Sequence, residues 1–204
     1  NTLTLVEQLF GSWQEVDNFI LVTIGRGVGL GIVVNGALYR GANGGGGEFG
    51  HTVIDPQGPH CACGNRGCLE TYVADPALLR LAQEATRDGD LPGPVEDVET
   101  LVALGQEEQP AAVHIFEQAG QKLGQGIANL INLLSPRMVI VSGEGARAGD
   151  LIFDPMREAI QRHVMPGLSS TFDIHIDPWE DDDWARGAAS LVLQQVFHTP
   201  LDSS

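Results

Sequence analysis

The chain has 204 residues, which is enough for one sizeable α/β domain, or for one domain with a fragment of a second. Hydrophobic residues make up 43% of it, but no apolar run approaches the ~20 residues of a membrane helix, so a membrane protein is excluded and a cytoplasmic one is expected. With 27 acidic and 11 basic residues the net charge is −16, so nucleic-acid phosphates would repel this segment as a whole.

The start of the sequence predicts a piece of a longer polypeptide. Asn1 is not preceded by a methionine and opens directly into a predicted helix at 2–10. We therefore expect further chain upstream.

Three short strands are predicted next. Apolar runs at 19–24 and 29–34 are joined by a glycine-rich turn, and Asn35-Gly36 separates the second run from 37–40. Asn-Gly between apolar stretches favours a type I′ turn, because both central residues take positive φ. The pattern therefore predicts three consecutive antiparallel strands.

Helices and strands alternate over the rest of the chain. Helices are predicted at 69–86, 97–105, 110–134, 151–163 and 184–197, and strands at 138–142 and 172–176. Hairpins followed by alternating helices and strands predict an α/β architecture with a mixed sheet.

The longest predicted helix, 110–134, has apolar residues near a 3.6-residue period and is expected to lie in the core. Gly120, Gly124 and Gly126 lower its intrinsic helix propensity. We expect close packing against a neighbouring element to compensate.

Four side chains of the metal-ligand type lie close together in the sequence. His51, Cys61, Cys63 and Cys68 include all three cysteines of the chain. Thiolate and imidazole suit a tetrahedral Zn²⁺ site, and four protein ligands leave no position for a catalytic water, so the expected zinc is structural. The alternatives are three buried cysteines beside an unrelated histidine, a disulfide that leaves one cysteine over, or His60 in place of His51.

Two glycine-rich segments indicate a ligand site. The segment 25–31 is followed by a strand, so it is neither a dinucleotide fingerprint nor a P-loop; it is a phosphate-cradling hairpin or a plain tight turn. The run 41–48 is typical of backbone that bends around a ligand. Glu48 and Glu70 beside His51 suit hydrogen bonding to vicinal sugar hydroxyls, although each glutamate alone is equally typical of a solvated surface charge.

The region from 22 to 74 resembles the ROK family of repressors, open reading frames and sugar kinases. The motifs that carry this resemblance are T-I-G-R-G-V-G-L-G-I-V-V-N-G, Y-R-G-A-N-G-G-G-G-E-F-G-H and C-A-C-G-N-R-G-C-L-E. A looser match continues through G-I-A-N-L-I-N-L-L-S-P to W-A-R-G-A-A and so covers nearly the whole chain. The resemblance implies an actin-like, ribonuclease-H-like fold of two lobes, with a sugar in the cleft and one structural zinc.

The resemblance also implies roles for particular residues. Glu48, His51 and Glu70 match the family's sugar contacts, beside Gly47 of the glycine loop, and His51 would ligate zinc through its other nitrogen. Asn1 matches the end of the family's N-D-x-N motif and is expected to contact the sugar as well. The Asp of that motif, the catalytic base of the kinases, would lie two residues before Asn1, so no catalytic residue is expected in this chain.

These matches predict the domain organisation. Residues 1–204 would form the C-terminal sugar-binding lobe of a ROK protein whose N-terminal part lies upstream. The 184–197 helix is expected to pack against that missing lobe. A homodimer or tetramer is expected. The apolar faces of the 110–134 and 184–197 helices either contribute to its interface or simply line the core.

Three departures from the kinase pattern favour the repressors of the family, which carry an N-terminal winged helix-turn-helix. Arg26 stands where kinases have a small hydroxyl residue, and Glu144 lies where they have a Gly-Gly-Gly turn for adenosine. The segment 179–189 resembles the repressor branch. The nucleotide site would then persist as a remnant formed by Gly25, Arg26, Gly27 and Gly143.

The sequence thus predicts the sugar-binding effector domain of a ROK transcriptional regulator. A monosaccharide in the interlobe cleft would control DNA binding by the absent winged helix-turn-helix, and this chain itself would not contact DNA. The alternatives are an ATP-dependent sugar kinase of the glucokinase type and a sugar-binding protein with neither activity.

Overall fold

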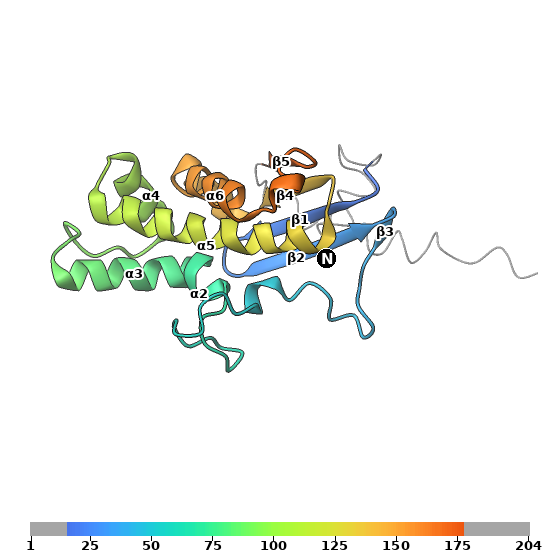
Figure 1. The fold of residues 1–204 in the computed structure, drawn as a ribbon. Coiled ribbons are helices and arrows are strands. Elements are labelled where there is room, and N and C mark those ends of the chain that lie inside the picture. The colour runs from blue at the N-terminus through green and yellow to red at the C-terminus, as the bar shows by residue number, and fades with distance from the viewer. Residues whose placement is uncertain (1–15, 178–204) are drawn as a thin grey trace, which may run out of the picture.

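The computed structural model describes residues 16–177, which form one mixed sheet with helices packed on it (Figure 1). Predictions for Asn1 and for the segments 2–10, 179–189 and 184–197 lie outside these residues. Within the described part of the chain, no helix is long and apolar enough to cross a membrane.

The sheet has 5 strands in the order β3-β2-β1-β4-β5. The strands are β1 (Phe19–Ile24), β2 (Val28–Val34), β3 (Ala37–Leu38), β4 (Met138–Ser142) and β5 (Asp173–Ile176). β1 to β3 pair antiparallel in succession, whereas β4 pairs parallel with both β1 and β5. The predicted mixed sheet and its opening antiparallel strands are therefore confirmed.

The predicted turn between β2 and β3 is confirmed by its backbone angles. Asn35 has φ 52° and Gly36 has φ 73°, so both central residues take positive φ. The turn is held against the segment that leads into β1, since the Gly36 N–H donates to the Asp17 carbonyl at 2.8 Å.

Five α-helices lie between or beside the described strands. They are α2 (Glu70–Val73), α3 (Asp75–Asp88), α4 (Val98–Gln106), α5 (Pro110–Leu134) and α6 (Asp150–His163). α4, α5 and α6 agree with their predicted ranges to within one residue at each end.

The single helix predicted at 69–86 is wrong, because the chain breaks at Ala74 between α2 and α3. Ala74 is extended (φ −70°, ψ 152°), and Pro76 has no N–H for the bond to the Tyr72 carbonyl that a continuous helix needs. The Asp75 N–H instead donates to the Gly25 carbonyl at 2.8 Å. The break thus ties the start of α3 to the turn between β1 and β2.

α5 runs through the centre of the core, beside α6 (Figure 1). A Cβ on Gly120 would collide with the Ile152 carbonyl oxygen, and one on Gly124 with the Met156 carbonyl oxygen. The helices therefore approach with backbone against backbone at Gly120 and Gly124, so the expected close packing is confirmed at these two glycines.

Candidate functional site

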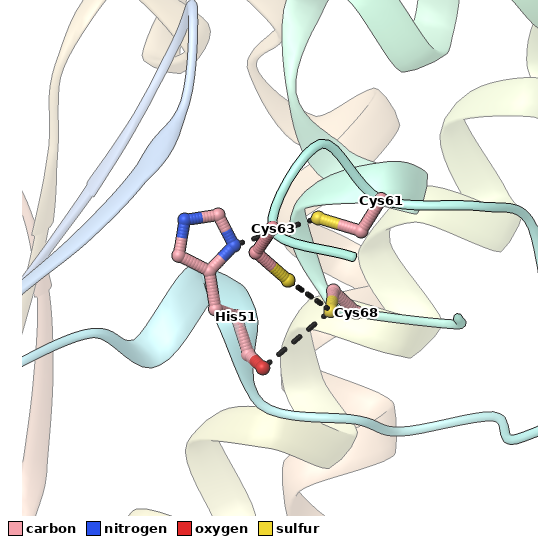
Figure 2. A group of neighbouring side chains, drawn as sticks. All are labelled: His51, Cys61, Cys63 and Cys68. Atoms are coloured by element: carbon pink, nitrogen blue, oxygen red, sulfur yellow. Dashed lines mark hydrogen bonds between the residues drawn. The ribbon is translucent and has the colours of Figure 1, made fainter. Parts of the chain in front are cut away.

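Four candidate metal ligands meet where the loop after β3 folds back on itself. His51 ends a short 3₁₀ turn (Phe49–His51), Cys61 and Cys63 lie in the following loop, and Cys68 comes just before α2. One ligand atom from each residue lies within 4.8 Å of all the others. The His51 Nδ1 atom is 3.5 Å from the Cys61 Sγ, and the Sγ atoms of Cys63 and Cys68 are 3.6 Å apart (Figure 2). This cluster could hold a metal ion, and it includes His51 rather than His60.

Tight turns within the loop bring the sulfur atoms together. The Cys61 N–H donates to the Asn65 carbonyl at 2.8 Å, and Gly64 between them has φ 96°, which favours glycine. Gly67 has φ 65°, and a side chain there would collide with the Asp55 carbonyl oxygen. The glycines of the C-A-C-G-N-R-G-C motif therefore serve the loop geometry.

The protonation of the thiols matters for metal binding. Burial raises the pKa of the Cys68 thiol to about 12, and hydrogen bonds with the other two cysteines act in the same direction. At Cys63, a hydrogen bond from the Asn65 backbone lowers the pKa. Since the thiolate is the ligand, a cation must displace the Cys68 proton, and binding therefore becomes weaker as the pH falls.

We call residues 51–68, which carry the four candidate ligands, the metal loop. Polar contacts join this loop to α2 and α5, and we call them the polar clamp. The Tyr72 hydroxyl of α2 donates to the Asp55 Oδ2 at 2.9 Å, and Lys122 of α5 lies 4.0 Å from the same oxygen and 5.1 Å from the Tyr72 ring centroid. The Tyr72 hydrogen bond and then the Gln57 backbone N–H hold the pKa of Asp55 below its usual value. Burial, followed by the bond to Asp55, raises the pKa of Tyr72 to about 12. The clamp therefore stays intact at neutral pH.

A cavity of about 640 Å³ opens between the metal loop and the ends of β1, β2 and β4. It brings together three predicted sugar contacts, Glu48, His51 and Glu70. The predicted nucleotide-site residues also line it, together with Glu144: Gly25, Arg26, Gly27 and Gly143. Gly47 precedes Glu48 but does not line the cavity, and Asn1 lies outside the described residues.

Glu70 joins the metal loop to the β1–β2 turn. Its Oε2 atom accepts the Val28 N–H at 3.1 Å. A Cβ on Gly27 would lie 2.9 Å from that oxygen, and one on Gly50 would lie 3.2 Å from it. Both glycines therefore leave room for a carboxylate at the cavity wall.

His51 borders both the metal cluster and the cavity. Its Nδ1 atom faces the Cys61 sulfur, and its other ring nitrogen points away from the three sulfurs (Figure 2). One imidazole can therefore bind a metal on one edge and a cavity ligand on the other.

Arg26 and Glu144, the two residues predicted to depart from the kinase pattern, lie next to each other at the cavity wall. The Arg26 Nε atom lies 4.0 Å from the Glu144 Oε2 atom, and the Arg26 side chain is 89% exposed. So exposed a pair contributes little to stability. It does place a guanidinium and a carboxylate side by side within the cavity.

A half-buried ion pair between Asp75 and Arg147, which sequence reasoning missed, supports the turns that follow β1 and β4. Arg147 donates from Nη2 to Asp75 Oδ2 at 2.7 Å and from Nη1 to the Glu144 carbonyl at 2.6 Å. The Asp75 N–H holds the Gly25 carbonyl, so one pair fixes the turns after β1 and β4. No local pattern signals a contact across 72 positions.

The sequence model of the ROK family matches residues 1–195. The chain belongs to the ROK family. A glucokinase of Thermotoga maritima is 32% identical over 96% of this chain and 64% of its own length. A xylose repressor of Caldicellulosiruptor bescii is 31% identical over 98% of this chain and 52% of its own length. The ROK hexokinase of Thermus thermophilus superposes with a TM-score of 0.82 at 32% identity, over 93% of this chain and 63% of that structure.

These similarities confirm the actin-like, ribonuclease-H-like fold that the ROK motifs imply. The related proteins include both a sugar kinase and a repressor, so membership of the ROK family leaves both functions open. The chain spans between 52% and 64% of the length of these two relatives.

Proposed function

We propose that this chain is the C-terminal sugar-binding lobe of a cytoplasmic ROK transcriptional regulator. A monosaccharide in the cavity would control DNA binding by a winged helix-turn-helix in the N-terminal part of the protein. One observation carries the proposal. The same cavity is lined by the predicted sugar contacts Glu48, His51 and Glu70 and by the neighbouring side chains of Arg26 and Glu144.

The cavity chemistry suits sugar hydroxyls. A carboxylate accepts two hydrogen bonds from vicinal hydroxyls, as Glu48 and Glu70 would do, and His51 adds a ring nitrogen. The ROK motifs add two further contacts to this proposal, Asn1 and the backbone of Gly47.

The metal we assign to the cluster is a structural zinc ion. Zn–S bonds of about 2.3 Å and Zn–N bonds of about 2.0 Å make a tetrahedron with edges of about 3.5–3.8 Å. The 3.5 Å and 3.6 Å separations in the cluster agree with such edges. Held by the metal on Nδ1, His51 would present its other nitrogen to the sugar in a fixed orientation.

The cavity is poorly suited to ATP. Glu48, Glu70 and Glu144 place three carboxylates around it, and the guanidinium of Arg26 is already next to one of them. Like charges at this range disfavour a polyphosphate. A regulator needs only a sugar affinity that differs between open and closed lobes, by about 1–3 kcal/mol. In a homodimer or tetramer, closure of the two lobes around the sugar would change the spacing of the DNA-binding domains.

Operator binding by the full-length protein tests the proposal. We expect fluorescence anisotropy with DNA from upstream of its own gene to show an affinity that changes about 5–150-fold when the effector sugar is added. Sugar-dependent ATP turnover without DNA binding would instead establish a kinase.

Replacing Glu70 with Ala should weaken monosaccharide binding by more than about tenfold, because charge-assisted hydrogen bonds to the hydroxyls and the position of the β1–β2 turn are both lost. Isothermal titration calorimetry measures the affinity, and metal analysis should show an unchanged content. Glu96→Ala, an exposed glutamate outside the cavity, is the control. Unchanged affinity in Glu70→Ala would refute the assignment of the site.

The second candidate function is a sugar kinase, which the 32% identity to a glucokinase favours. If Arg26 and Glu144 exclude nucleotide, the double variant Arg26→Thr, Glu144→Gly should bind the ATP analogue AMP-PNP at least about tenfold more tightly than the wild type. Equilibrium dialysis measures this in the full-length protein. If the wild type already binds the analogue as tightly as the variant, our interpretation of these residues is wrong.

A further inference from the structure

A second hollow of about 230 Å³ adjoins the sugar cavity at Glu70, which lines both spaces. Its walls are the loop around residues 59–62 and the first turn of α3. It shares Arg26 and Glu70 with the sugar cavity. We call it the side pocket; the two shared side chains make it a neighbour of the sugar cavity.

Charge is distributed unequally between the two spaces. The sugar cavity has three carboxylates, Glu48, Glu70 and Glu144, and Arg26 is the one arginine or lysine in its lining. The side pocket has two arginines, Arg26 and Arg80, against the Glu70 carboxylate and the sulfur of the metal-cluster residue Cys61, and His60 adds a ring N–H. Hydroxyl groups therefore match the first space, and an anion matches the second.

Arg80 is held in place at the wall of the side pocket. Its Nη1 atom donates to Glu84 at 3.0 Å, and its Nη2 atom donates to the Thr71 carbonyl at 3.4 Å. These bonds use two of the five N–H donors of a guanidinium, so others are available to a ligand. Arg26, by contrast, is 89% exposed and only 4.0 Å from Glu144, so its guanidinium can turn towards either space.

The other walls of the side pocket are mainly apolar. They comprise Pro59, Ala62, Ala74, Pro76 and Ala77. Apolar walls lower the local dielectric and strengthen the attraction between an anion and a fixed guanidinium. The space also corresponds to several water volumes of about 30 Å³ each, so a phosphate or carboxylate group fits.

We propose that the effector is a monosaccharide with an anionic substituent, a phosphate or a carboxylate. Its hydroxyls bind Glu48, His51 and Glu70, and its anionic group lies in the side pocket against Arg80, Arg26 and His60. This inference rests on the proposed sugar site, and it adds the chemical class of the ligand.

Calorimetry on the full-length, metal-loaded protein tests the inference. The probes are glucose, glucose 1-phosphate, glucose 6-phosphate, glucuronate and inorganic phosphate. We expect at least one anionic sugar to bind about tenfold or more tightly than glucose, and inorganic phosphate to bind weakly on its own. The phosphate esters and glucuronate distinguish the two anionic groups.

The variant Arg80→Met should bring the ratio between the anionic sugar and glucose close to one and abolish phosphate binding. Arg87→Met removes an exposed arginine from the same helix outside the side pocket, so it should keep the wild-type ratio. If glucose binds as tightly as every anionic probe, or if Arg80→Met leaves the ratio unchanged, the inference is wrong while the sugar site stands. If no probe binds, both the inference and the proposed function fail.

Discussion

Replacing Cys68 with Ser is expected to abolish metal binding and to lower the free energy of unfolding by more than about 3 kcal/mol. Cys68 is fully buried, and its Sγ lies 3.6 Å from that of Cys63. A serine hydroxyl is a poor ligand for a metal that thiolates prefer. Metal analysis by mass spectrometry and unfolding in urea measure the two effects.

Two further variants separate ligation from packing. Cys63 is exposed, so Cys63→Ser should lose the metal as completely as Cys68→Ser but with a smaller additional loss of packing. Ala62→Ser changes a neighbouring exposed residue and should retain full metal content. A chelator should destabilise the wild type and leave Cys68→Ser unaffected. Full metal content in Cys68→Ser would refute the ligand set.

The histidine ligand can be tested in the same way. His51→Asn should lose the metal, because its Nδ1 atom faces the Cys61 sulfur. His60→Asn should retain it, since His60 lies outside the cluster. If His51→Asn keeps the metal and His60→Asn loses it, His60 is the ligand in place of His51.

Features encoded by neighbouring residues could be predicted from the sequence. Asn35-Gly36 specifies its turn through the φ angles of two adjacent residues, and the period of α5 specifies its buried face. The metal cluster is of the same kind, because its four ligands lie between His51 and Cys68 and the loop glycines allow the chain to fold back.

Features that depend on distant residues could not be predicted. The break at Ala74 serves a hydrogen bond from Asp75 to the Gly25 carbonyl, and nothing within the 69–86 pattern indicates that acceptor. The Asp75–Arg147 pair joins turns that lie far apart in the chain. The side pocket likewise arises only when the metal loop and α3 come together around Glu70. Local periodicity therefore predicted where the helices and strands lie, whereas a tertiary contact determines that the predicted 69–86 helix is interrupted at Ala74.

Replacing Gly124 with Ala is expected to destabilise the protein by more than about 2 kcal/mol, although the same change in an isolated helix would stabilise it by about 1 kcal/mol. The new Cβ would collide with the Met156 carbonyl oxygen and lie 2.7 Å from the Ala159 Cβ. Both belong to α6, and a backbone oxygen cannot turn aside as a side chain can. The helices must therefore separate, which opens space throughout the core between them.

The sign of this effect distinguishes close helix packing from helix propensity. Gly120→Ala should also destabilise the protein, since its Cβ would collide with the Ile152 carbonyl oxygen. Gly93→Ala is the control: Gly93 has open space around it, so this variant should have an unchanged or slightly higher stability. Urea unfolding at matched metal content gives all three values. A raised midpoint for Gly124→Ala would mean that propensity governs α5 and that its glycines are not there for α6. Lowered midpoints for Gly124→Ala and Gly120→Ala would show that the close α5–α6 contact requires both glycines, at the expense of helix propensity.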